Sequence, residues 1–387
     1  MTRLFLLEPE PLDLWAPFAG ARPVAELRAG AWLLRERWEA SLGVPCAGIL
    51  GPQAEGFSDV AGPPAVTHAA VRGPAIVARA DVIPPRRALA FGGAARLRVG
   101  EHDVAWELPA GAVWSGPSDE GGAIAIDGLV LRGAFELITV LERLLGSDCA
   151  EFASAPADPV PAGAIVIGEP GGVICMSAVV EPGVVFDVTR GPVVLSEGVQ
   201  VRSGVRLEGP LFAGPGTRFL GGQIRRSSFG PECRVHGEVT DSVFTGYANK
   251  SHEGFVGHSV LGAWVNLGAG TTTSNLKNTY GPVRLGLPGG PVETERTLLG
   301  SLIGDHVKTA IGTMLSTGTV IGAGASLFGH TGIPRYVAPL AWGSAGTQRV
   351  ALERFLTTAE RVMARRGIEF TPARAEALRR FHERATR

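Results

Sequence analysis

The chain has 387 residues, of which 54 are glycine and 28 are proline, and its formal net charge is −1. Glycine is about twice as frequent as in average proteins, which excludes a long helical bundle, and an apolar content of 45% excludes a disordered chain. The near-zero net charge points to neither nucleic acid nor an anionic membrane as a partner. Only three of the 36 basic residues are lysine, namely Lys250, Lys277 and Lys308.

Residues 1–150 predict a mixed α/β domain. Short apolar runs at 4–7, 75–77 and 97–99 are typical of buried strands. Apolar side chains at helical spacing predict one helix over 31–42, ended by Gly43, and another over 135–145. The segment between them is rich in turn residues, so the domain combines a sheet with few helices.

Residues 151–340 differ in texture from the first domain. After a Pro- and Ala-rich linker at 151–162, glycine becomes more frequent and a six-residue period appears. The repeating positions are Val193, Val199, Val205, Leu211 and Thr217, and later Ile303, Thr309, Leu315, Ile321 and Leu327. Each unit reads as a short strand and a turn in which glycine supplies positive φ, and three units close one coil of a β-helix.

The period is interrupted twice. Residues 240–255 depart from it, and residues 273–300 form a polar, Pro- and Gly-rich insertion. Segments that leave a regular scaffold often carry function, so both breaks mark candidate site regions.

Residues 341–387 predict two helices separated by Gly367, and Thr371-Pro372 supplies an N-cap followed by proline at the first helical position. Arginine dominates this tail. Its simplest interpretation is a solvated face on helices that cap the coil stack. The alternative is contact with a phosphate-bearing ligand or a neighbouring subunit.

Cysteine spacing and hydropathy bound the cellular setting. The four cysteines are far apart, and no His/Cys/Asp grouping has metal-ligand spacing, so no metal site is expected. The first apolar run is too short for a signal peptide, and no apolar run reaches the roughly 18 residues of a membrane span. These features predict a cytoplasmic protein with no membrane segment.

Reactive side chains are densest around the two breaks. Residues 249–258 contain Lys250 and His252, and residues 265–271 read Val-Asn-Leu-Gly-Ala-Gly-Thr, with Asn266 as the polar member. Histidine suits a general base near neutral pH, and backbone amides in a Gly-rich turn can stabilise an oxyanion.

The 265–271 motif resembles that of the acetyltransferase half of GlmU-like bifunctional proteins, in which a catalytic histidine precedes the motif asparagine by 14 positions. His252 stands at that spacing from Asn266. Residues 17–28, 275–282 and 304–313 further resemble a divergent GlmU-like branch of sugar nucleotidyltransferases. Phe255 and Leu276 replace family tyrosines near the sugar, which leaves the amino-sugar substrate open.

The resemblance implies an N-terminal nucleotidyltransferase-like domain, a left-handed β-helix that forms homotrimers, and a role in UDP-N-acetylglucosamine and cell-wall biosynthesis. It implies acetyl transfer from acetyl-CoA to an amino-sugar phosphate, with His252 as base, Asn266 on the sugar amine or carbonyl and Lys250 on the phosphate. The residues it places near acetyl-CoA are Gly268, Ala269, Thr271, Thr309 and Thr313.

For the N-terminal domain, the resemblance suggests Arg22 and Arg28 as phosphate ligands and Asp81 as a carboxylate for Mg²⁺. The family loop Leu-x-x-Gly-x-Gly-Thr-Arg is absent, and Val24 stands where a lysine is expected. The domain is therefore either active or a binding-only relative.

Two alternatives remain open from the sequence. The chain could be a nucleotidyltransferase or sugar-nucleotide-binding protein whose β-helix only assembles subunits. It could also be a β-helix metalloenzyme of the carbonic anhydrase kind, in which histidines from adjacent subunits bind zinc.

Overall fold

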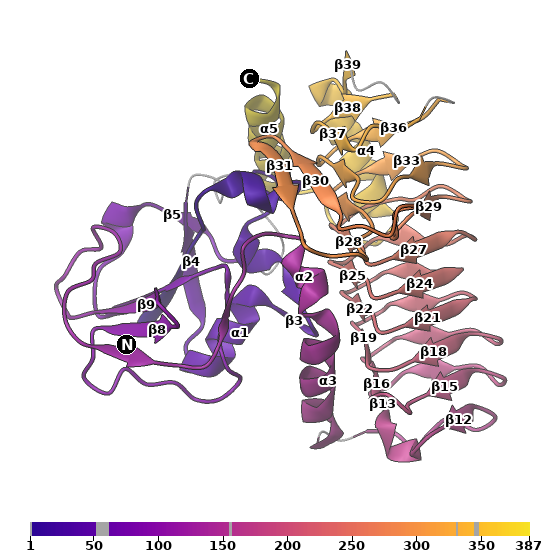
Figure 1. The fold of residues 1–387 in the computed structure, drawn as a ribbon, viewed down its shortest axis with the longest axis horizontal. Coiled ribbons are helices and arrows are strands. Elements are labelled where there is room, and N and C mark those ends of the chain that lie inside the picture. The colour runs from indigo at the N-terminus through magenta and orange to yellow at the C-terminus, as the bar shows by residue number, and fades with distance from the viewer. Residues whose placement is uncertain (1, 52–61, 155–156, 330–331, 344–347) are drawn as a thin grey trace.

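The computed structural model describes residues 2–51, 62–154, 157–329, 332–343 and 348–387. An N-terminal α/β region is followed by a long parallel β-helix and two C-terminal helices, which confirms the predicted fold class (Figure 1).

A seven-stranded sheet forms the centre of the N-terminal region. In spatial order its strands are β10 (Ala123–Ala125), β8 (Arg96–Val99), β9 (His102–Leu108), β6 (Ala75–Arg79), β1 (Arg3–Leu7), β4 (Cys46–Leu50) and β5 (Ala65–Val66). Strand β1 is parallel to both β4 and β6, whereas β9 is antiparallel to β6 and β8. The shorter pieces are the paired β2 (Arg28–Ala29) and β3 (Trp32–Leu33), the paired β7 (Val82–Ile83) and β11 (Leu129–Val130), and the 3-10 turns η1 (Leu12–Trp15), η2 (Val24–Glu26) and η3 (His68–Ala70).

The helices of this region differ in part from expectation. Helix α1 (Leu34–Leu42) ends at Gly43, which adopts φ 67°, as the sequence predicts. The second predicted helix is instead a single turn, α2 (Glu136–Thr139), followed by α3 (Leu141–Glu151). Helix α3 extends beyond the predicted end because Asp148 faces inward to a buried ion pair with Arg37, which no apolar period reveals.

The β-helix has three parallel sheets. The first contains β12 (Ile165–Ile167), β15 (Val185–Asp187), β18 (Arg206–Glu208), β21 (Gln223–Arg225), β24 (Glu238–Thr240) and β27 (Phe255–Gly257). The second contains β13 (Val173–Cys175), β16 (Val193–Leu195), β19 (Leu211–Ala213), β22 (Ser228–Phe229), β25 (Val243–Phe244), β28 (Val260–Leu261), β32 (Leu302–Ile303), β35 (Val320–Ile321) and β37 (Tyr336–Val337).

The third sheet has a lower and an upper part. Its lower part contains β14 (Val179–Val180), β17 (Gln200–Val201), β20 (Arg218–Phe219), β23 (Arg234–Val235) and β26 (Asn249–Lys250). Its upper part contains β33 (Lys308–Thr309), β36 (Ser326–Leu327), β38 (Ala341–Trp342) and β39 (Gln348–Arg349). Strands β29 (Thr272–Thr273) and β34 (Met314–Leu315) pair with each other. They lie on the side of the β-helix that the first sheet forms in the preceding coils.

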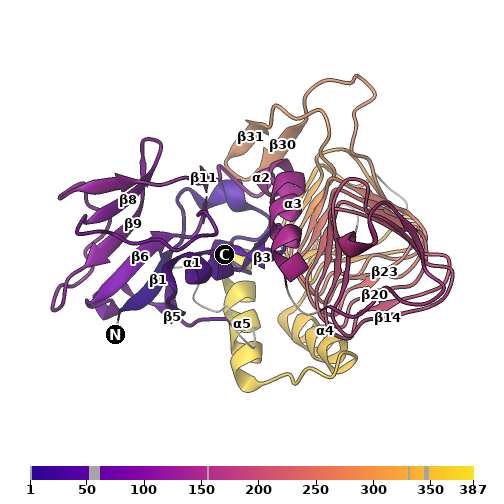
Figure 2. The same cartoon turned by 90° about the horizontal axis from the view of Figure 1, so that it is seen from below.

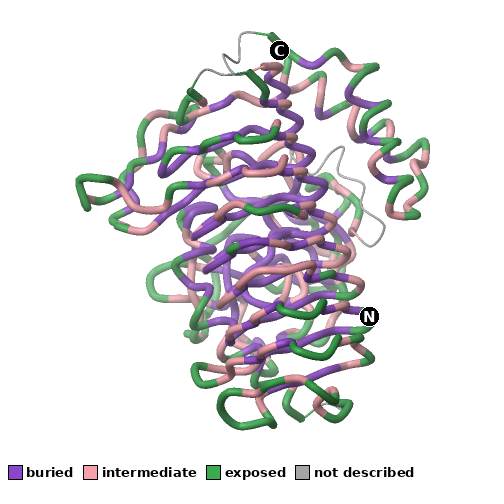
Figure 3. The backbone as a smooth tube through the Cα atoms, turned by 90° about the vertical axis from the view of Figure 1, so that its right-hand side faces the viewer, coloured by how far each residue is buried: buried purple, intermediate pink, exposed green. Residues whose placement is uncertain are grey.

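Every member of the two six-residue runs is buried, as the period predicts. The expected interruption at 240–255 is wrong, because β24 to β27 pair in continuous register with the coils on either side. The coil that leads into this segment is only shortened: Ser228 pairs with Val243, 15 residues later, whereas Val193 pairs with Leu211, 18 residues later. The residues are lost from the turns, so the strand ladder survives. Figure 3 shows buried backbone inside the stack and exposed residues mainly at turns.

Residues 273–300 leave the coil, since Val260 pairs with Leu302, 42 residues later. They include the antiparallel hairpin β30 (Arg284–Leu287) and β31 (Gly290–Glu293). Leu285 and Leu299 of this excursion are fully buried in the same core cluster as the N-terminal sheet. The hairpin therefore packs between the β-helix and the N-terminal region.

The outer face of the nine-stranded sheet is covered rather than solvated. Helix α3 and the hairpin lie against it (Figures 1 and 2), and its outward side chains share one core cluster with the N-terminal sheet. These side chains are Ile174, Val194, Phe212, Val243, Val260, Leu302 and Val320. The two regions thus bury a common apolar surface, which explains why strands such as Val193–Leu195 are apolar on both faces.

The C-terminal helices are α4 (Leu352–Ala364) and α5 (Pro372–Thr386). Thr371 caps α5, because its hydroxyl accepts a hydrogen bond from the Arg374 amide at 3.3 Å. Phe355 and Met363 of α4 are buried against turns of the β-helix, and Arg384 of α5 donates to the Gly20 carbonyl at 2.8 Å. The tail therefore lies along one edge of the coil stack and contacts the N-terminal region.

Candidate functional sites

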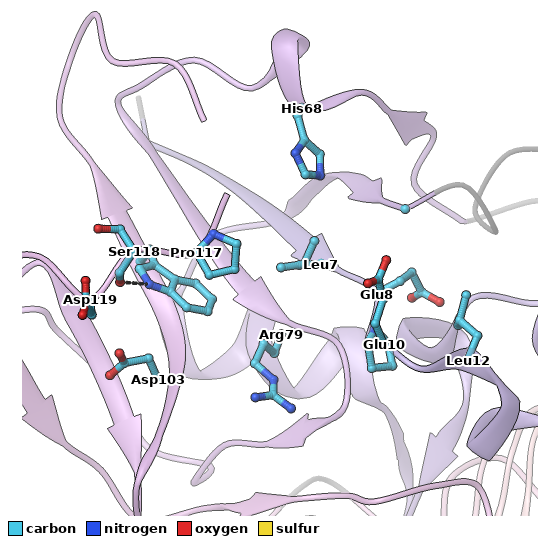
Figure 4. A pocket seen from close by; sticks show the side chains of 13 residues that line it. Leu7, Glu8, Glu10, Leu12, His68, Arg79, Asp103, Pro117, Ser118 and Asp119 are labelled. Carbon is cyan, nitrogen blue, oxygen red and sulfur yellow. Dashed lines mark hydrogen bonds between the residues drawn. The ribbon is translucent and has the colours of Figure 1, made fainter. Parts of the chain in front are cut away.

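The N-terminal sheet carries a cavity of about 700 Å³. It opens where the parallel strands β1, β4 and β6 end, the position at which open α/β sheets bind ligands (Figure 4). Its walls are Leu7, Glu8, Pro9, Glu10, Leu12, Gly51, His68, Arg79, Asp103, Trp106, Pro117, Ser118 and Asp119. Apart from Leu7, which ends the predicted strand at 4–7, none of these residues was predicted from the sequence, although the end of that strand was a usable signal.

Glu8 is the buried acid of this cavity. Its carboxylate accepts hydrogen bonds from the amides of Val24 at 2.8 Å and Ala25 at 3.3 Å. Burial raises its pKa to about 7 and outweighs these two bonds, which act in the opposite direction. The Glu8 side chain therefore fixes the η2 turn to the end of β1 and titrates near neutral pH.

The charges of the cavity do not suit a triphosphate. Four carboxylates line it, whereas the basic lining residue Arg79 is already bonded to Asp81 through Nε at 3.0 Å and Nη2 at 2.7 Å. A phosphate chain needs unpaired cations or a glycine-rich amide cradle at this position.

The three N-terminal residues predicted to hold nucleotide or metal lie in separate contacts. Arg22 forms a buried ion pair with Asp305 of the β-helix at 2.9 Å. Arg28 donates to the Ala31 carbonyl and lies over the Phe212 ring at 5.6 Å. Asp81 is buried and bonded to Arg79.

These residues do not fit a Mg²⁺ site. The Asp81 carboxylate is held by a guanidinium, and among the residues the structure describes no cluster of three His, Cys, Asp or Glu side chains could hold a metal ion. The three residues predicted to contact nucleotide and Mg²⁺ therefore do not form one site.

In the β-helix, Lys250 occupies an inward position. The residue in register with it in the coil below is the apolar Val235. Its side chain is 1% exposed, and its ammonium donates to the backbone carbonyls of His236, at 3.0 Å, and His252. Burial lowers its pKa to about 8. The ammonium therefore anchors the backbone of the turn that carries His252.

His252 lies in the exposed turn between β26 and β27. This turn stacks directly on the predicted Gly-rich turn, because the Gly270 amide donates to the Glu253 carbonyl at 2.9 Å. The next coil continues the stack, since the Gly312 amide donates to the Ala269 carbonyl at 2.7 Å. The structure thus brings His252 and the predicted acetyl-CoA residues to one edge of the β-helix.

The predicted threonines of this edge are engaged internally. Thr271 and Thr309 share a hydrogen bond between their hydroxyls at 2.8 Å, and Thr313 donates to the Ala310 carbonyl at 2.8 Å. The Gly268 amide also meets the Thr309 hydroxyl at 3.1 Å. All three threonine hydroxyls are buried with their residues, so they hold the shape of the turn stack.

Asn266 lies on the outer face of the β-helix, on the side formed by the third sheet. It is in register with Asn249 of the preceding coil and with Lys308 of the following coil. Asn249 Nδ2 donates to Asn266 Oδ1 at 2.7 Å, and Ser251 donates to Asn249 Oδ1 at 2.5 Å. Asn266 therefore connects through hydrogen bonds to the strand that leads into the His252 turn.

No family model matches the chain. It is 36% identical over 91 residues to a bifunctional sugar-1-phosphate nucleotidylyltransferase/acetyltransferase of Sulfurisphaera tokodaii, which covers 24% of this chain and 23% of that protein. It is 37% identical over 86 residues to the bifunctional protein GlmU of Methanococcus maripaludis strain C7, and 34% identical over 86 residues to that of Methanocaldococcus jannaschii. The match covers 22% of this chain and 21% of the relative in each of these two cases.

The alignments thus span less than a quarter of the length of these curated relatives. In the described part of the chain, no helix is long and apolar enough to cross a membrane. Over this matched segment, the chain is similar to GlmU-like bifunctional sugar-1-phosphate nucleotidyltransferase/acetyltransferases.

Proposed function

We propose that the chain is a transferase of sugar-nucleotide metabolism whose β-helix transfers an acetyl group from acetyl-CoA to an amino-sugar phosphate. The carrying observation is the exposed His252 turn stacked on the Gly268–Thr271 turn of the next coil. An exposed histidine in this position supports the proposal, because an imidazole can serve as the general base that takes a proton from an attacking amine.

In this proposal the His252 imidazole accepts the proton that the attacking amine loses. The amine nitrogen forms a bond to the thioester carbonyl carbon, and the thiolate of coenzyme A leaves. Lys250 is a positioning residue, because its ammonium holds the His252 carbonyl from inside the coil. Asn266 orients the sugar amine or carbonyl from the neighbouring coil.

Acetyl-CoA would lie along the turn stack near Ala269. The amides of Gly268, Gly270 and Thr271 donate within the stack, so the Gly-rich turn supplies shape and close approach for the thioester. Thr309 and Thr313 support this turn from the next coil.

The test is release of coenzyme A from acetyl-CoA by the full chain, in the presence of a panel of amino-sugar phosphates. His252→Ala is expected to lower kcat by about 10²- to 10⁴-fold, the usual contribution of a general base. The matched control is His102→Ala, which removes an exposed histidine of the N-terminal sheet. Full turnover by His252→Ala, or no turnover of any panel member by the unaltered chain, overturns the proposal.

We further propose that the β-helix assembles into a homotrimer. Support comes from the turn stack and the adjacent sheet face, where Ile311 is 80% exposed and Met314 is 69% exposed. Large apolar side chains this exposed are typical of a protein interface. Light scattering of Ile311→Glu/Met314→Glu is expected to show a smaller assembly than the unaltered chain, and an unaltered chain that is monomeric overturns this proposal.

A further inference from the structure

A cleft of about 230 Å³ lies between the outer face of the β-helix and helix α4. Its lining residues are Tyr247, Asn249, Trp264, Val265, Asn266, Lys308, Val362, Arg365 and Arg366. The floor is the column formed by Asn249, Asn266 and Lys308, which occupy the same register position in three successive coils.

The walls of the cleft are fixed by packing. Tyr247 and Trp264 stack in parallel, with ring centroids 4.2 Å apart, at equivalent turns where both adopt positive φ. Met363 of α4 packs in one cluster with Trp264 and Ala263. The cleft is therefore a preformed feature of the fold, closed on one side by the C-terminal tail.

The lining contains three cations and no carboxylate. The Lys308 ammonium donates to the carbonyls of Trp264 at 2.9 Å and His306 at 3.0 Å, which leaves its third N–H for another acceptor. In the described part of the chain, neither Lys308 nor Arg365 nor Arg366 forms a salt bridge.

Arg366 carries a second indication. Its Nε is buried and lacks a hydrogen-bond partner among the described residues. A buried donor without a partner is costly, and binding of an anionic group would remove that cost. The carboxylate that most affects this guanidinium, Glu232, is itself bonded to Arg234 at 2.9 Å.

The amides on the floor also present a donor. Ser251 donates to Asn249, and Asn249 donates to Asn266 Oδ1. This direction leaves the Asn266 NH₂ group for a ligand in the cleft. Ammonium, guanidinium and amide donors converging on one small space match an anionic oxygen cluster.

We propose that this cleft binds a phosphoryl group of a small phosphorylated ligand through Lys308, Arg366 and Asn266. The size supports this ligand class, because 230 Å³ is below the roughly 300–1,000 Å³ of pockets for drug-sized ligands. The cleft and the proposed acyl-transfer site have one residue in common, Asn266. The proposal of phosphoryl binding therefore depends on the proposed function only through the role of Asn266.

Calorimetric titration of the full chain tests the proposal without any acyl donor, with inorganic phosphate, glucose 1-phosphate and glucose as probes. Phosphate or glucose 1-phosphate is expected to bind and glucose is expected not to. Tighter binding of glucose 1-phosphate assigns the cleft to a phosphomonoester, and tighter binding of inorganic phosphate assigns it to the free anion.

Arg366→Gln is expected to weaken phosphoryl binding about tenfold or more, since it removes charge-assisted hydrogen bonds. The control is Arg361→Gln, an equal loss of charge from an exposed position in the last turn of α4, just before Arg366. Equal weakening by both variants, or no binding of either phosphate probe, overturns the proposal. The two proposals can fail separately. Arg366→Gln leaves His252 unchanged, so acetyl-CoA turnover can persist when phosphate does not bind to the cleft. Phosphate can also bind to the cleft when the chain shows no acetyl-CoA turnover.

Discussion

The N-terminal region and the β-helix bury positive charge in different ways. In the N-terminal region, most of the buried arginines meet carboxylates: Arg37 pairs with Asp148, and both side chains are 1% exposed. Arg22 and Arg96 are also paired with carboxylates, whereas Arg28 donates to the Ala31 carbonyl. In the β-helix, Lys250 and Lys308 instead donate to backbone carbonyls. A carbonyl stabilises an ammonium without cancelling its charge, so Lys308 can attract an anion when it is protonated. Burial lowers the pKa of Lys308 to about 7, so this attraction weakens above neutral pH.

The two cavities follow this difference. The large N-terminal cavity is lined by Glu8, Glu10, Asp103 and Asp119, whereas the cleft under α4 has only cations among its charged walls. The cleft proposed to bind a phosphoryl group therefore lies on the β-helix side of the molecule, away from these carboxylates.

Asp148→Ala is expected to lower the free energy of unfolding by about 3–5 kcal/mol, because it leaves the buried Arg37 guanidinium without its partner. Urea denaturation measures the loss. Arg37→Met/Asp148→Ala should recover much of it, since the unpaired charge is then gone. A loss below about 1 kcal/mol for Asp148→Ala would contradict the view that N-terminal cations depend on their carboxylates.

Glu8 should make stability fall as pH rises. Its ordinary pKa of 4.5 applies in the unfolded chain, and burial raises the pKa to about 7 in the fold, so the folded chain keeps a proton that the unfolded chain releases. The free energy of unfolding is expected to drop by about 3 kcal/mol between these two pH values, at 1.36 kcal/mol per pKa unit. Denaturation curves of Glu8→Gln should lack this drop, and parallel pH profiles for the two proteins would disprove the assignment.

Lys250 should give the opposite slope. Because its pKa falls from 10.5 to about 8 on folding, the unfolded chain binds the proton more tightly, and stability rises between these pH values. At pH 7, Lys250→Met is expected to change the free energy of unfolding by only about 1 kcal/mol, since the lost hydrogen bonds are offset by relief of the buried charge. If Lys250→Met lowered the free energy of unfolding as much as Asp148→Ala does, the two regions would not differ in how they stabilise buried charge.

Asp127→Ala is expected to change the free energy of unfolding least among these variants. Its ion pair with Arg87 is exposed on both sides, at 83% and 65%. Such pairs contribute little in water, so the expected change is a few tenths of a kcal/mol. Urea denaturation at low and high salt checks this value, and a change above about 1 kcal/mol would show that exposure does not separate the two kinds of pair.

The family resemblance, not the six-residue period, singled out His252 and the Gly268–Thr271 turn. The two turns lie on one edge because stacked coils place equivalent turns one above another, and the expected break at 240–255 hid this stacking. The inward position of Lys250 was not predicted, because the shortened coil at 234–249 shifts which residues face the core. The roles suggested for Arg22 and Asp81 likewise ignored partners that only packing supplies.

The β-helix could be predicted from the amino-acid pattern, because an inward aliphatic position every six residues and glycine at turns are local requirements that each coil repeats. The cap of α5 could be predicted too, since Thr371 and Pro372 act on their own helix. Which charges are available depends instead on packing between distant elements. Arg22 is neutralised by Asp305, 283 residues away, and Lys308 and Arg366 share a cleft because α4 folds back on the coils. Pairing across such distances depends on how finished elements pack, and no local pattern records it.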